Sequence, residues 1–170
     1  VPTQRRIQFL QRRRGMSAGV LAGNEAMKEK RLAKAKEIVG TIKTVESAAS
    51  EELRSSAAWK AIVVEWGQIE TDVLEWTGAE SFRRHTELIA NVLTFMTDVA
   101  DKYSLTLDPD IDSYYLIDTV MNKAPYALER LGQMRAKGTG ILTKKQIAPQ
   151  DQVEMNTLMA ELNGALRPLK

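Results

Sequence analysis

Apolar side chains recur at steps of three and four residues along most of the chain, which is the spacing of one face of an α-helix. The clearest run has its inward positions at Trp59, Ile62, Trp66, Ile69, Val73 and Trp76. All three tryptophans of the chain lie on this seam. An aromatic stripe at helical spacing is more often the core of a bundle than the wall of a cofactor site. We therefore interpret the seam as core.

Weaker runs of the same spacing predict further helices, joined by short turns. Together the predicted helices span residues 3–21, 25–49, 59–76, 80–104, 112–137 and 149–166. Glycines at positions 138 and 140 are expected to break the chain before a segment over 141–148 that is irregular or briefly helical. Strand-like alternation is nearly absent. The sequence therefore predicts an all-α fold, an elongated antiparallel bundle of five or six helices that resembles a four-helix bundle.

Individual positions on these helices carry further expectations. The inward seams of the second, fourth and fifth helices are expected to include Leu32, Tyr103, Tyr114, Leu128 and Leu131. Pro125 lacks an amide proton and crowds the carbonyl group of Met121, which predicts a kink. His85, close to a turn, is expected on the surface or at the rim of the bundle. The spacing of Gly15 and Gly19 predicts a close approach between helices and not a phosphate cradle.

The composition is that of an ordinary globular domain, with 44% hydrophobic and 27% charged residues in 170. One domain over residues 1–170 is the default for that length. With no cysteine and one histidine, the chain excludes disulfides, thiol nucleophiles and metal centres that need two imidazoles. No constellation of acid, base and nucleophile is evident. We expect neither an enzyme nor a bound cofactor or metal.

Acidic residues alternate ahead of the fifth helix as in a calcium-binding loop, at Asp108, Asp110 and Asp112. Ser113 then stands where such a loop needs glycine, and Thr119 stands where it needs a bidentate glutamate. A calcium site is therefore rejected. The carboxylates are better explained as helix caps, with Asp108 before Pro109 or with Asp112 and Ser113 at the start of the helix.

The first fourteen residues carry five arginines and no acid. Contact with nucleic acid, a position near a membrane, or pairing with acids elsewhere in the fold would each explain this charge. No interleaved aromatic residues or helix-turn-helix spacing point to nucleic acid, so the second and third readings are favoured. No segment of the chain approaches the roughly 20 apolar residues that a membrane span needs.

The first helix buries an arginine whichever of two neighbouring faces turns inward. One face carries Arg14 and Ser17, and the other carries Arg13. A buried guanidinium needs a carboxylate or several other acceptors, because an unpaired buried charge is strongly destabilising. A polar stripe on the fifth helix offers such groups at Tyr115, Asp118, Asn122, Tyr126 and Glu129. Asp118 is the natural internal partner of Arg14.

Two segments resemble a known family. The first is Gln11-Arg-Arg-Arg-Gly-Met-Ser-Ala-Gly-Val-Leu-Ala-Gly-Asn24, and the second is Leu107-Asp-Pro-Asp-Ile-Asp-Ser-Tyr-Tyr-Leu116. In this order they resemble the helical extracytoplasmic input domain of bacterial transmembrane receptors. The build is similar to the nitrate/nitrite-sensing and the helical bimodular types. The resemblance covers residues 4–135, and the pairing of the two segments is its specific part.

The resemblance implies a ligand site. In related sensors, small anions or organic acids bind between helices through arginines of the first helix, which points here to Arg13, Arg14 and Ser17. Candidates for the opposite wall, chosen from the polar stripe and its neighbour and not from a family motif, are Tyr114, Tyr115 and Asp118. In the alternative interpretation, Arg14 and Asp118 pair only to fix the register of two helices, and sensing passes through a separate periplasmic binding protein.

The implied function is that of a periplasmic ligand-sensing module in a membrane-anchored receptor. A sensor histidine kinase is the expected output, and a chemoreceptor is the alternative. Such a module is expected to act as a homodimer that relays helix shifts to the cytoplasm. The chain itself is read as an excised piece of that receptor. The alternative hypothesis, from a different functional class, is a helical scaffold protein whose tryptophan seam docks a partner helix.

Overall fold

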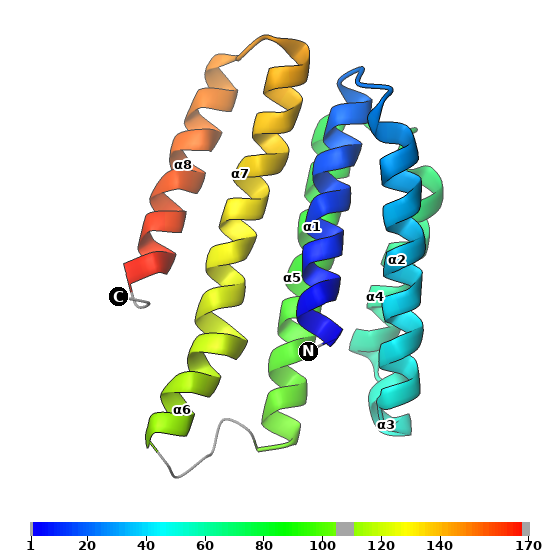
Figure 1. The fold of residues 1–170 in the computed structure, drawn as a ribbon, viewed down its shortest axis with the longest axis vertical. Coiled ribbons are helices and arrows are strands. Elements are labelled where there is room, and N and C mark those ends of the chain that lie inside the picture. The colour runs from blue at the N-terminus through cyan, green and yellow to red at the C-terminus, as the bar shows by residue number, and fades with distance from the viewer. Residues whose placement is uncertain (1, 105–110, 168–170) are drawn as a thin grey trace.

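The computed structural model describes residues 2–104 and 111–167. Its helices, in chain order, are α1 (Pro2–Leu21), α2 (Met27–Ala48), α3 (Glu51–Ser55), α4 (Ala57–Asp72), α5 (Gly78–Lys102), α6 (Ile111–Asp118), the π-helical turn η2 (Thr119–Lys123), α7 (Ala124–Lys144) and α8 (Pro149–Leu166). No strand occurs within these ranges. The long helices run antiparallel to their chain neighbours in an elongated bundle (Figure 1), which confirms the predicted all-α class.

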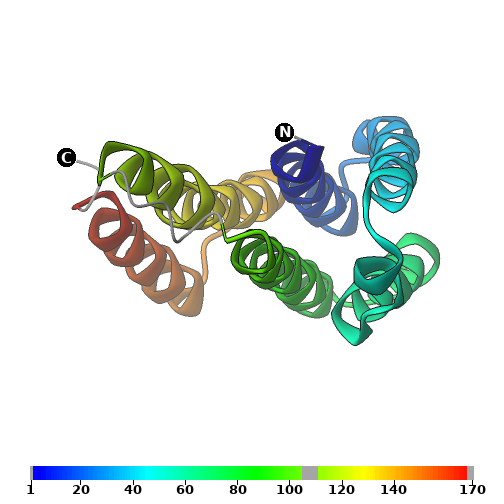
Figure 2. The ribbon, with the colours of Figure 1, turned by 90° about the horizontal axis from the view of Figure 1, so that it is seen from below.

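The first helix occupies the centre of the assembly. It packs against α2, α5 and α7, and α4 packs against α5. Seen along the helices, α1, α2, α4 and α5 form a four-helix bundle, and α7 and α8 extend it on one side (Figure 2). Side chains on α1 therefore meet their long-range partners mainly on these three helices. None of the helices in the described ranges is long and apolar enough to cross a membrane.

The tryptophan seam lies in the core, as predicted. The buried positions of α4 are Trp59, Ile62, Trp66 and Ile69, with Val73 directly after the helix. They join a cluster with α5, to which Leu88, Ile89 and Val92 contribute. Ser56 and Thr77 cap the two helices by accepting hydrogen bonds from Trp59 and Glu80 backbone N–H groups. Because Trp59 and Trp66 are buried, they offer no surface for docking a partner helix, and Trp76 packs partly buried against the same cluster.

The small residues of α1 permit the close packing that their spacing predicts. A Cβ at Gly19 would meet the Met27 side chain of α2 and would lie 3.3 Å from Cγ2 of Thr139 on α7. At Gly15 the nearest atom would be the Ala136 Cα, at 3.9 Å. Gly19 thus lets α1 pack closely against α2 and α7, whereas a Cβ at Gly15 would make an ordinary van der Waals contact.

Helix α7 is longer than the sequence predicts. It continues through Gly138 and Gly140 and ends only at Lys144, before Lys145 adopts a left-handed conformation with φ 53°. Each glycine weakens a helix by roughly 1 kcal/mol relative to alanine. Packing of α7 against both α1 and α8 offsets this intrinsic preference. The expected break at residues 138–140 is therefore wrong.

The kink expected at Pro125 takes the form of the π-helical turn η2, which ends two residues before the proline. A wider turn relieves the clash between a proline ring and the preceding carbonyl group. The helix start expected at Asp108 and Pro109 lies outside the described residues. Asp112 does lie in the first turn of α6.

Several expected core positions are exposed. These are Leu32, Tyr103, Tyr114, Leu128 and Leu131. On α7 the buried face is instead largely polar or small, and it includes Glu129, Gly132, Gln133 and Ala136. The physical reason lies in α1, whose inward face carries arginines and needs acceptors and close approach from its neighbour. The apolar seam predicted for the fifth helix is therefore wrong, and its polar stripe is partly core.

Candidate functional site

Arg14 is paired within the fold. It has no exposed surface, and its Nη1 donates to Oε1 of Glu129 at 2.6 Å while Nη2 donates to Oε2 at 3.3 Å. Nη1 also donates to Oγ1 of Thr86 at 2.9 Å. The prediction that Asp118 is its partner is wrong. Asp118 and Glu129 share one stripe, but Glu129 stands three helical turns further along and thus level with Arg14.

Two further side chains donate hydrogen bonds to the Glu129 carboxylate. Gln11 Nε2 donates to Oε2 at 2.9 Å, and Gln133 Nε2 donates to Oε1 at 2.9 Å. Gly132 makes this approach possible, because a Cβ there would lie 3.0 Å from the Gln11 amide carbon and 3.2 Å from Arg14 Nη2. The result is a buried polar layer between α1 and α7 in which Arg14 has its counter-ion.

The structure does not bring the three candidates from α6 to this place. Tyr114 and Tyr115 are exposed and lie edge to face with their rings 5.6 Å apart. Asp118 accepts hydrogen bonds from Lys123 and from Asn122, and these contacts, with Lys123 the stronger, lower its pKa. Asp118 is thus occupied locally, and none of the three forms a wall opposite Arg13, Arg14 and Ser17.

Arg13 turns to the other side of α1 and is also fully buried. Its Nη1 donates to the backbone carbonyl of Arg31 at 3.1 Å, and its guanidinium lies 4.9 Å from the centre of the Trp66 ring. Burial, and then the charge of Arg31, lower the pKa of Arg13 to about 10, against an opposing effect of Glu70. No carboxylate in the described ranges lies within ion-pair distance of Arg13.

Arg31 is a second buried arginine beside Arg13, and the sequence did not point to it. It is 5% exposed, and burial lowers its pKa. Its Nε and Nη1 atoms have no hydrogen-bond partner in the described part of the chain. The helical seam of α2 could have revealed it, because the buried positions Arg31, Ala35, Ile38 and Ile42 follow steps of four, three and four.

His85 of α5 is fully buried, so its expected position at the rim is wrong. Its Nδ1 lies 2.7 Å from the Ser81 carbonyl oxygen. A carbonyl only accepts, so Nδ1 carries the proton, and Nε2 of the neutral ring is an acceptor. Burial lowers the pKa of His85 to about 3, and the charges of Arg13, Arg14 and Arg31 act in the same direction. Helical spacing could have predicted its burial, because His85, Leu88 and Val92 lie on one buried seam of α5.

These residues together form what we term the arginine cluster, composed of Arg13, Arg14, Ser17, Arg31 and His85. Its buried polar atoms without a hydrogen-bond partner are Nε of all three arginines, Nη1 of Arg31, Oγ of Ser17 and Nε2 of His85. The Nε1 atom of Trp66, whose ring stacks against the Arg13 guanidinium, is also buried without a hydrogen-bond partner. Nearly all buried polar groups in folded proteins are paired. Most of these atoms are N–H or O–H donors, so the cluster is suited to an anion with several acceptor oxygens.

The buried neutral histidine makes stability depend on pH. Between pH 6.5 and about 3 the unfolded chain binds a proton at His85 that the folded chain does not. The free energy of unfolding should therefore fall with falling pH by up to about 1.4 kcal/mol per pH unit from this group. Urea unfolding of wild type and His85→Gln at pH 4.5 and 6.0 measures it. The variant should show a shallower slope by about that amount, and equal slopes would contradict a buried neutral imidazole.

Comparison with known proteins gives one match. A family model described as nitrate and nitrite sensing covers residues 7–168. No curated protein and no solved structure matches the chain. The matched range holds all five members of the arginine cluster and the α7 residue Glu129 that binds Arg14.

Proposed function

Because the chain belongs to the nitrate and nitrite sensing family, a family of input modules in signalling receptors, we propose that its arginine cluster is the anion site. The observation that supports this proposal is the set of buried donors on α1 and α2 that have no acceptor in the described ranges. Nitrate and nitrite are the ligands proposed. Both are small anions whose oxygens are acceptors, and nitrate is planar, as a guanidinium is.

The location of the cluster explains how an anion would be held. Arg13, Arg14 and Ser17 come from α1, Arg31 from α2 and His85 from α5. Burial, and then repulsion from Arg31, lower the pKa of Arg13, and an anion between the two arginines would offset that repulsion. It also gives acceptors to desolvated N–H groups, which otherwise weaken the fold. The bound state therefore draws α1 and α2 together.

Arg14 connects this site to the opposite half of the bundle. Its Nε belongs to the unpaired set, while its Nη atoms bind Glu129 of α7. An anion that attracts the Arg14 guanidinium competes with Glu129 for it. Binding can then shift α1 relative to α7, which is the differential contact that a two-state sensor needs. The ion pair also sets the register of α1 and α7, so the internal-pair interpretation holds for Arg14 with Glu129 in place of Asp118.

The direct test is calorimetric titration of the protein with nitrate, nitrite and acetate at constant ionic strength, with chloride as the background salt. Nitrate or nitrite should bind wild type, and Arg31→Gln should raise the Kd by about tenfold or more. Lys30→Gln, an exposed neighbour on α2, is the matched control and should leave the Kd unchanged. Binding of equal strength in Arg31→Gln and wild type would place the anion elsewhere.

For the receptor around this module, we propose a periplasmic location, membrane anchoring, homodimerisation and a histidine kinase output. The support is the family, whose members are extracytoplasmic sensor modules of receptors. A chemoreceptor output is the alternative, and the module itself is proposed to have no catalytic role. Sequencing the flanking gene regions tests this: apolar spans on both sides and a kinase domain are expected, and polar flanks would contradict the receptor. Sedimentation of the module measures dimerisation.

A further inference from the structure

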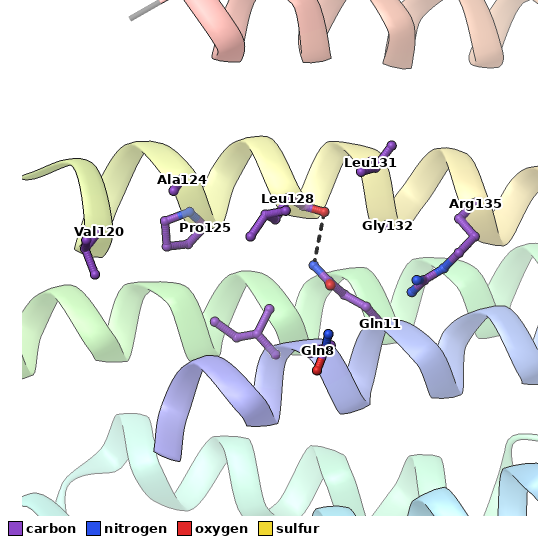
Figure 3. A pocket seen from close by; sticks show the side chains of 10 residues that line it. Gln8, Gln11, Val120, Ala124, Pro125, Leu128, Leu131, Gly132 and Arg135 are labelled. Atoms are coloured by element: carbon purple, nitrogen blue, oxygen red, sulfur yellow. Dashed lines mark hydrogen bonds between the residues drawn. The ribbon is translucent and has the colours of Figure 1, made fainter. Parts of the chain in front are cut away.

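A cavity lies on the opposite side of α1 from Arg13, between α1 and the stretch from η2 to α7 (Figure 3). Its volume is about 520 Å³, within the range of pockets that hold small organic ligands. The apolar part of its lining includes Ile7, Val120, Pro125, Leu128 and Leu131. It shares no residue with the arginine cluster, so a ligand here would be separate from the proposed nitrate site.

The cavity has a basic end. Arg135 reaches from α7 toward α1 at one end, beside Gln8 and Gln11, while Val120 lies at the other end (Figure 3). No hydrogen bond or ion pair to the Arg135 side chain occurs among the described residues, although it is exposed enough to meet a ligand. Partial burial, and then the charges of Arg12 and Arg14, lower its pKa. The local excess of positive charge attracts a carboxylate.

Neighbouring structure keeps the cavity open. The Gln11 amide donates to the Leu128 carbonyl at 3.3 Å and to Glu129 at 2.9 Å, so it is held against α7 and does not fill the space. The π-helical turn and Pro125 shape the apolar end. Turns of this kind occur frequently at functional sites. Leu128 and Leu131 remain 58% and 51% exposed along the cavity, and their apolar surface would be buried by an occupant.

We propose that this cavity binds a free alkyl or aryl carboxylate. The carboxylate accepts hydrogen bonds from Arg135 and Gln8, and the apolar tail lies along Leu128 and Pro125 toward Val120. An inorganic anion such as nitrate lacks the tail that would cover these side chains. An uncharged alcohol of the same length lacks the charge that Arg135 attracts. The structure thus assigns the module a second ligand class, at a site adjoining the Gln11 and Glu129 contacts of the α1–α7 layer.

The probe is octanoate, with 1-octanol and nitrate for comparison, followed by amide NMR shifts and by calorimetry on the whole chain. Octanoate should shift the amides around Gln11, Leu128 and Gly132, and 1-octanol should bind more weakly. Arg135→Gln should weaken octanoate binding by about fivefold, as expected for a partly exposed charge pair. Lys144→Gln, an exposed lysine on the same helix, should have no effect. Equal octanoate affinity in wild type and Arg135→Gln would overturn the proposal.

A second pair of variants tests the apolar wall without disturbing the core. Leu128→Asp places a negative charge in the lining and should abolish octanoate binding. Leu142→Asp makes the same change at an α7 position that is 78% exposed and outside the cavity, and should bind as wild type does. Octanoate binding retained in Leu128→Asp would overturn the proposal. Sedimentation can also overturn the proposal. It would do so by showing that a second copy of the chain covers this face in a dimer, and that octanoate neither binds this dimer nor dissociates it.

Discussion

Replacing Glu129 with alanine is expected to lower the free energy of unfolding by about 3–5 kcal/mol. The variant leaves Arg14, which has no exposed surface, as a buried charge without its counter-ion. It also removes the acceptor that Gln11 and Gln133 share. Urea unfolding followed by far-ultraviolet circular dichroism gives the change. This is the largest stability effect that we expect from a single substitution in the buried polar layer between α1 and α7.

An exposed ion pair provides the matched comparison. Glu161 of α8 contacts Arg130 of α7 at 3.2 Å, with the Glu161 side chain 42% exposed. Glu161→Ala should cost less than about 1 kcal/mol, because solvent screens the pair. A double variant, Arg14→Met with Glu129→Leu, replaces the buried pair by apolar groups and should regain much of the stability lost in Glu129→Ala. A loss below about 1 kcal/mol for Glu129→Ala would contradict the buried pairing.

The choice of Glu129 over Asp118 shows which part of the site was predictable. Helical spacing identifies residues on one face, and it placed both acids on the same polar stripe. It does not give the height at which one helix stands beside another. Periodicity along one helix carries no information on that height, because it describes the helix alone and not its neighbour. The need of a buried arginine for an acid on the fifth helix was therefore correct, and the partner was not.

The misplaced seam of α7 has a related cause. The periodicity predicts the apolar residues as the inward face, although Leu128 and Leu131 lie at a cavity and Glu129 and Gln133 of the polar face are buried toward α1. Binary patterning assumes that a helix meets an apolar neighbour. Here the neighbour presents arginines, and the rule fails at the layer where function is proposed. Where the neighbours are apolar, as along the Trp59 to Val73 seam, the same rule succeeds.

Substituting Arg13 with methionine should change stability and anion binding in opposite directions. Without anion, the variant is expected to be about 1–3 kcal/mol more stable, because a desolvated charge with no carboxylate partner is removed and the volume is retained. The expected gain is net of the lost contacts with the Arg31 carbonyl and the Trp66 ring. Nitrate affinity should fall by about thirtyfold or more, since one charged donor of the cluster is lost.

One measurement separates these two effects. At nitrate concentrations of a hundred times the wild-type Kd, wild type should gain about 2.7 kcal/mol in unfolding free energy by mass action, and Arg13→Met should gain at most about 0.9 kcal/mol. Arg12→Gln removes an exposed arginine from the preceding position and should respond to nitrate as wild type does. An Arg13→Met protein that is less stable than wild type without nitrate would show that Arg13 stabilises the fold. A full nitrate response in Arg13→Met would show that Arg13 is not part of the anion site. The expected pattern, greater stability with a lost response, is that of a charge buried for binding and not for folding.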